Sequence, residues 1–133
     1  MRTVRCAVAL LLGMLLAGCA GAALAGDPDR GEKLFTGRIA LSARGAAPTC
    51  ASCHGIGPDG KSPLGPSLYG VAGRAAFRVT GMAPADYLCQ SILDPDAVLV
   101  DNYQEGIMFR GYRETLTDQQ VADLVAYLLT LQP

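Results

Sequence analysis

The chain has 133 residues, with 11 Lys and Arg against 12 Asp and Glu, and 50% of its residues are hydrophobic. This length allows one domain at most. A formal net charge of −1 leaves no basic surface for neutralising phosphates, which argues against non-specific binding to nucleic acids. The sequence contains no repeat with a period of roughly 20 to 50 residues, and its apolar content is too high for a disordered protein. A small compact domain remains.

An uncharged, apolar segment occupies residues 6–25 and follows two arginines. This pattern predicts an export signal. Within it, Leu16-Ala17-Gly18-Cys19 closely resembles a bacterial lipobox, so we expect cleavage before Cys19 and attachment of a lipid to that cysteine. The alternatives are cleavage after Ala25 by ordinary signal peptidase, or an uncleaved helix that spans the bilayer. Each of these outcomes places the domain outside the cytoplasm.

We therefore divide the chain into a signal peptide (1–18), a tether (19–30) and one domain (31–133). A domain of this size buries a smaller fraction of its surface than a large one does. We expect a cofactor or a cross-link to add to its stability.

The first predicted element is a helix near the start of the domain. Asp27 can cap it, and Pro28 suits its first position because the proline ring presets φ and its missing N–H is not needed there. Gly31, Leu34 and Phe35 then share one face, which we expect to pack in the core.

Cys50-Ala51-Ser52-Cys53-His54 has the C-x-x-C-H pattern of c-type haem attachment. Two thiols three positions apart on a helical turn can reach the two vinyl-derived carbons of one porphyrin edge, and the adjacent imidazole then points at the iron. We therefore predict one covalent haem c, held by Cys50 and Cys53 and coordinated by His54.

Other uses of these cysteines fit less well. A thioredoxin-like redox pair needs a strand followed by a helix, whereas the flanking sequence is rich in Gly and Pro. A zinc site needs four ligands, and the additional candidate is the distant Cys89. A disulfide within the motif would close a loop too short to stabilise the fold much. We expect Cys89 to be a half-buried, inert cysteine, and an intermolecular disulfide is the alternative.

Residues 62–74 combine proline and glycine with apolar side chains, a composition that suits a rigid loop along one haem face. A second helix is predicted from Pro84 to Leu93, and Asp94-Pro95 ends it. Long loops of this kind argue against a compact domain unless something organises them. A haem inside the fold would do so.

The sixth iron ligand can be approached by elimination. His54 is the only histidine, so a second histidine ligand cannot come from this chain. Methionine remains, and because Met1 and Met14 fall in the leader, the candidates are Met82 and Met108. We favour Met108, because its longer separation from His54 lets the chain pass round the haem edge and present sulfur on the opposite face. Met82, a lysine ligand and an open site are the alternatives.

The last helix is predicted after Thr117, which can form a capping box with Gln120. Apolar residues follow at helical spacing: Val121, Leu124, Val125, Leu128 and Leu129. Three helices, long loops and no convincing strand make the predicted fold class all-α, wrapped around one haem.

The chain from about residue 29 to residue 131 resembles the class I monohaem cytochromes c of bacteria. The matching stretches are Gly31 to Phe35, Cys50 to Gly55, Leu64-Gly65-Pro66-Ser67-Leu68, Gly70-Val71-Ala72-Gly73-Arg74, Ser91-Ile92-Leu93-Asp94-Pro95 and Leu116 to Leu131. The resemblance implies the class I cytochrome c fold, in which the first and last helices cross through Gly31, Phe35 and Tyr127.

The resemblance also implies roles for residues outside the C-x-x-C-H motif. The carbonyl oxygen of the proline in Gly-Pro-x-Leu, here Pro66, would accept a hydrogen bond from the ligand histidine and set its tautomer. Arg74 would approach a haem propionate. Without these roles, Pro66 would stiffen a turn and Arg74 would be a solvated side chain. The ligand methionine of the family is usually followed by proline, whereas Met108 is followed by Phe109.

The expected function is one-electron transfer on the periplasmic side of a membrane, in a respiratory or photosynthetic chain, and the protein is not expected to be an enzyme. Its partners would be redox proteins, in particular a membrane oxidoreductase complex. A lipid on Cys19 would keep it at the membrane. The alternatives are a fixed haem subunit of a membrane oxidoreductase, and a peroxidase-like or gas-binding protein with an open sixth site.

Overall fold

The computed structural model describes residues 24–41 and 47–133. Within these ranges the regular elements are all helical, which confirms the all-α class. In chain order they are α1 (Pro28–Thr36), the short 3₁₀ helix η1 (Cys50–Ser52), α2 (Val71–Ala75), α3 (Pro84–Leu93), α4 (Tyr112–Thr115) and α5 (Asp118–Leu128). The predicted signal peptide, Cys19 with its lipobox and the first part of the tether lie outside the described residues.

Helix α1 begins where the sequence predicts it. The Asp27 side chain accepts hydrogen bonds from the backbone N–H groups of Asp29 (3.0 Å) and Arg30 (3.2 Å), and Pro28 occupies the first turn. These bonds satisfy N–H groups that no carbonyl of the helix can reach. The helix ends at Gly37, whose φ of 78° is the left-handed conformation that glycine adopts without a steric penalty.

Helix α5 has the predicted capping box. The Thr117 hydroxyl oxygen accepts a hydrogen bond from the backbone N–H of Gln120 (3.2 Å), and the Gln120 side-chain oxygen accepts one from the backbone N–H of Thr117 (3.1 Å). The face of α5 that packs in the core contains Val121, Leu124, Val125, Tyr127 and Leu128. The capping box fixes the residue at which α5 begins, and the buried residues that follow form one face directed at the core.

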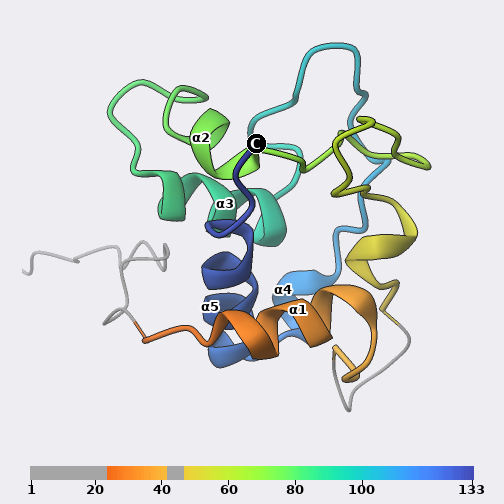
Figure 1. Cartoon of the computed structure of the whole chain (residues 1–133), viewed down its shortest axis with the longest axis vertical. Helices are drawn as coiled ribbons and strands as arrows, with labels where there is room; N and C mark the ends of the chain where they lie inside the picture. Colours follow the sequence, from red (N-terminus) through yellow and green to blue (C-terminus); the bar gives the residue numbers. More distant parts are fainter. Residues whose placement is uncertain (1–23, 42–46) are drawn as a thin grey trace, which may run out of the picture.

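Helices α1 and α5 cross in close contact, as the orange and dark blue ribbons show (Figure 1). Gly31 lies at the crossing, where a Cβ atom would come within 2.0 Å of the backbone oxygen of Asp123. The rings of Phe35 and Tyr127 pack beside it, with centroids 5.4 Å apart. The crossing that the family resemblance implies is therefore present.

Asp123 on α5 fixes the segment that precedes α1. Its side chain is fully buried, and its carboxylate accepts hydrogen bonds from the backbone N–H of Asp27 (2.9 Å) and the side-chain amide of Gln119 (2.8 Å). It also forms an ion pair with the guanidinium of Arg30 (3.3 Å). Residues 28–30, which the sequence division assigned to the tether, form the first turn of α1. The described end of the tether is thus packed against the domain.

The remaining helices position the loops. Helix α3 contacts α2, α4 and α5, and buries Tyr87, Leu88 and Ile92. The C-terminus lies beside α2 (Figure 1). There the backbone N–H of Ala72 donates to the carbonyl of Leu131 (3.3 Å).

Cys89, as predicted, is half-buried and packs against the core. In the part of the chain that the structure describes, none of the helices combines the length and apolar character needed to span a bilayer.

Candidate functional site

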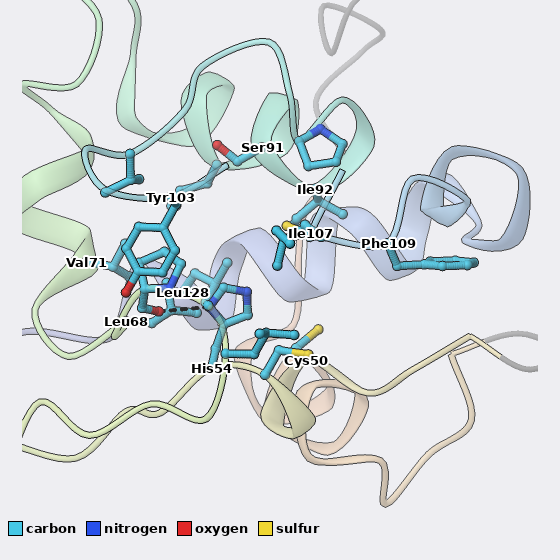
Figure 2. A pocket seen from close by; sticks show the side chains of 18 of the residues that line it. Cys50, His54, Leu68, Val71, Ser91, Ile92, Tyr103, Ile107, Phe109 and Leu128 are labelled. Atoms are coloured by element: carbon cyan, nitrogen blue, oxygen red, sulfur yellow. Dashed lines mark hydrogen bonds between the residues drawn. The ribbon is translucent and has the colours of Figure 1, made fainter. Parts of the chain in front are cut away.

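A cavity of about 170 Å³ lies between the loops and the buried faces of α3 and α5. Its walls include every site residue proposed from the sequence for the haem: Cys50, Cys53, His54, Pro66, Arg74 and Met108. Met82, the alternative ligand, is not among the lining residues and packs against the core instead. Ile107, next to Met108, lies across the cavity from His54 and Cys50 (Figure 2). The structure therefore brings together residues that are far apart in the sequence.

The turn η1 places the motif on the cavity wall. The backbone N–H groups of Cys53 (3.1 Å) and His54 (2.9 Å) both donate to the carbonyl of Cys50. This winding puts both thiols and the imidazole within one turn of chain. Burial raises the pKa of the Cys50 thiol to about 11.

The loop after the motif folds back onto it. The Ser62 hydroxyl donates to the carbonyl of Cys53 (3.0 Å) and accepts from the backbone N–H of Gly55 (2.9 Å). The backbone N–H of Gly65 also donates to the carbonyl of Cys53 (2.8 Å), and that of Leu68 donates to the carbonyl of Gly55 (2.8 Å). These bonds fix the distance between the motif and the Gly-Pro-x-Leu loop.

The imidazole of His54 is oriented by this loop. Its Nδ1–H donates to the carbonyl oxygen of Pro66 (2.8 Å; dashed line in Figure 2). In the neutral ring this leaves Nε2 unprotonated. Gly65 lies against the ring, since a Cβ at that position would be 2.4 Å from Cε1 of His54. Burial lowers the pKa of His54, and the hydrogen bond to Pro66 partly opposes this effect. The net result favours neutral imidazole, the form that binds iron.

Arg74 packs over the outside of the same loop. Its guanidinium donates to the carbonyls of Ser67 (2.7 Å) and Tyr69. Two of the five N–H groups of the guanidinium are used in this way, and three remain for another acceptor. Arg74 thus lines the cavity and also holds the loop that orients His54.

The opposite wall comes from the segment around Met108, whose side chain is partly buried against the core. Phe109 packs edge-on against Tyr112, with ring centroids 5.0 Å apart. The Tyr112 hydroxyl donates to the carbonyl of Pro48 (2.7 Å), which ties this wall to the chain just before the motif. Burial, more than the nearby thiols, raises the pKa of Tyr112 far above its ordinary value, so the phenol remains a donor.

Asp96 links the two ends of the Met108 segment. One oxygen of its carboxylate accepts from the backbone N–H of Gly106 (2.8 Å), and the other pairs with Nε of Arg110 (2.5 Å). The bond from Gly106, reinforced by the hydrogen bond and charge of Arg110, lowers the pKa of Asp96 from its ordinary value. The carboxylate is therefore ionised at neutral pH.

Three groups in this arrangement were not singled out from the sequence. The sequence places Gly65 in the Gly-Pro-x-Leu loop, but its contact with the His54 ring was not predicted. Its position directly before Pro66, the expected hydrogen-bond partner of His54, could have indicated that contact. Ser62 and Asp96 carry no such signal, because their partners lie elsewhere in the loops and are brought near only by folding.

The family model described as Cytochrome c matches residues 28–132. The chain belongs to the cytochrome c family. Cytochrome c2 of Rhodomicrobium vannielii is 30% identical over 129 residues, covering 90% of this chain and 91% of that protein. Cytochrome c2 of Blastochloris viridis is 30% identical over 132 residues, covering 90% of each chain. Cytochrome c2 of Rhodoblastus acidophilus is 45% identical over 62 residues, which spans about half of each chain (47%).

Membership of this family confirms the predicted class I cytochrome c fold and the predicted cofactor, one covalently attached haem c. The protein is a one-electron carrier of an electron-transport chain on the periplasmic side of the membrane. It acts with redox partner proteins. The residues of the cavity fit this cofactor, because two thiols, a neutral imidazole and a thioether sulfur share one largely apolar space.

Proposed function

We propose that Cys50 and Cys53 would hold the haem by thioether bonds, that His54 and Met108 would supply the nitrogen and sulfur ligands of its iron, and that the protein transfers electrons without catalysing a reaction on a substrate. The observation that carries this proposal is the cavity in which these four side chains meet. Each cysteine would supply both the sulfur and the hydrogen that add across a vinyl group of the haem, one to each carbon. No oxidant is needed for this step.

The residues around His54 orient its imidazole for binding iron. The hydrogen bond to Pro66 selects the tautomer with the proton on Nδ1, and contact with Gly65 limits rotation of the ring. Such outer partners hold a ligand in place and raise its basicity. Because Arg74 binds the carbonyls of Ser67 and Tyr69, it keeps this loop in position, and its three remaining N–H groups support a contact with a haem propionate.

The bound haem supplies the Fe(III)/Fe(II) couple. The apolar walls exclude water from the cavity, and methionine sulfur favours the reduced metal, so both features raise the reduction potential. Phe109 and Tyr112 close the side that carries Met108. These residues keep an electron-transfer site shielded, whereas a haem enzyme needs access for a substrate at the sixth position.

The ligand assignment is tested by comparing Met108→Ala with Met82→Ala. In the oxidised protein, sulfur ligation gives a weak near-infrared charge-transfer band. We expect Met108→Ala to abolish this band, because its sulfur lines the cavity, and Met82→Ala to retain it, because its side chain packs elsewhere. The reverse result would transfer the ligand role to Met82.

We further propose that residues 1–18 form a signal peptide and that a lipid on Cys19 holds the carrier near a membrane oxidoreductase partner. The lipobox at 16–19 supports this proposal. A diacylglyceryl group on Cys19 carries two acyl chains, which suffice for stable anchoring, and a short tether would then confine the domain to the membrane surface. The Cys19→Ser variant should be released from the membrane fraction or accumulate as uncleaved precursor. Unchanged mass and fractionation would instead support cleavage after Ala25.

A further inference from the structure

The segment that carries Met108 is held by few backbone interactions of its own. Among the described residues, the backbone N–H groups of 98–110 make one backbone hydrogen bond, from Tyr103 to the carbonyl of Val100 (3.0 Å). Leu99 and Ile107 are about half exposed (46% and 48%). A segment with few backbone bonds and exposed side chains opens locally at a low free-energy cost. Something else must keep Met108 in place.

Asp96 provides two bonds that span this segment. It lies just after α3, and its side chain is only 20% exposed. Its partners, Gly106 and Arg110, bracket Met108 at two residues before it and two residues after it. The backbone at Gly106 has a φ of 76°, so the chain turns there immediately before the methionine. The two bonds therefore fix both ends of the turn that presents the sulfur.

We propose that Asp96 is a positioning residue that, through Gly106 and Arg110, holds the Met108 segment closed so that the sulfur stays on the iron and external ligands stay out. This inference rests on the proposed function, because it requires Met108 to be the sixth ligand. Asp96 is among the residues that line the cavity, but its carboxylate oxygens bind Gly106 and Arg110, and it acts on Met108 through them. It lowers the population of the form in which the Met108 segment has moved away from the iron.

The opposite charges of Asp96 and Arg110 also favour this role. Arg110 is the charged group that Asp96 contacts, and charge-assisted hydrogen bonds to guanidinium are stronger than neutral ones. The bond from Gly106 needs only an oxygen acceptor, whereas the bond from Arg110 gains from the negative charge. Asp96→Asn should therefore keep the first bond and weaken the second, and Asp96→Ala removes both.

The test measures binding of imidazole to the oxidised holoprotein, because imidazole can bind the iron only when the methionine has left. We expect Asp96→Ala to bind imidazole at least about threefold faster than the wild type, and Arg110→Gln to show a smaller increase. The near-infrared band should be weakened in Asp96→Ala. Asp96→Asn, which keeps the acceptor for Gly106, should lie between the wild type and Asp96→Ala.

A matched control lies in the loop that follows the C-x-x-C-H motif. Asp59 accepts a hydrogen bond from the backbone N–H of Lys61 (3.2 Å) and pairs with Nζ of the same lysine (3.6 Å). It therefore has the same two kinds of bond as Asp96 but does not span the Met108 segment. Asp59→Ala should bind imidazole at the wild-type rate and keep the full band.

Three outcomes would overturn the inference. The first is a wild-type imidazole rate and a full band in both Asp96→Ala and Arg110→Gln, while Met108→Ala lacks the band. The second is a lowered midpoint of denaturant unfolding in Asp96→Ala with no change in the imidazole rate, which would make the role purely structural. The third is a retained near-infrared band in Met108→Ala, which would overturn the ligand assignment itself. The Met108→Ala spectrum separates this outcome from the first, in which that variant lacks the band.

Discussion

Gly65 and Pro66 act on the imidazole of His54 in different ways. Pro66 supplies the acceptor for Nδ1–H, and Gly65 supplies the space, since any side chain there would push against Cε1. Ser62 joins the carbonyl of Cys53 to the backbone N–H of Gly55 and so fixes the loop from which both act. Small changes at these positions would tilt the ring without altering an iron ligand.

At the scale of single residues, roles that depend on neighbouring positions or on residue type could be predicted, whereas hydrogen bonds between distant residues could not. The roles proposed for Cys50, Cys53 and His54 follow from their spacing, because one turn of chain presents all three groups. Pro66 and Arg74 were found only through the family resemblance. Asp96 was not found at all, because nothing in the sequence shows that its carboxylate reaches Gly106 and Arg110.

Among the elements, the crossing of α1 and α5 holds the first and last helices together. Gly31 permits the contact, and the fully buried carboxylate of Asp123 joins the start of α1 to α5 through Asp27 and Arg30. Removing the shared acceptor would leave the N–H of Asp27 without its partner, which costs free energy when such a group is screened from water.

We expect Gly31→Ala to lower the free energy of unfolding by about 1–3 kcal/mol, because the added Cβ must displace the backbone of Asp123. Gly73→Ala on α2 is the matched control, since a Cβ there meets nothing within 4 Å. That variant should be unchanged or more stable by up to about 1 kcal/mol. The measurement is denaturant unfolding of the holoprotein. Equal stability of the two variants would show that the crossing tolerates a side chain.

The long helices could be predicted and the short ones could not. Helices α1, α3 and α5 have caps, prolines or apolar spacing that mark their ends and faces. Helices α2 and α4 span five and four residues, and isolated helices of this length do not form in water. They depend on contacts with distant parts of the fold, so local sequence carries little signal for them.

In the whole molecule, the haem site is shared between the two halves of the chain. The first half supplies the cysteines and His54, and the second supplies Met108 and the segment held by Asp96. The crossing of α1 and α5 joins these halves (Figure 1). Long loops are compatible with a compact domain here because they enclose a cofactor, as expected from the sequence.

The central claim is that this cytochrome c transfers electrons through an iron closed on both faces by His54 and Met108. The most direct test is an optical spectrum of the oxidised and reduced holoprotein at neutral pH, including the near-infrared region, with CO added to the reduced protein. The account predicts low-spin spectra, the sulfur-to-iron band in the oxidised form and no change with CO. A high-spin spectrum that shifts with CO would show an open iron and contradict the account.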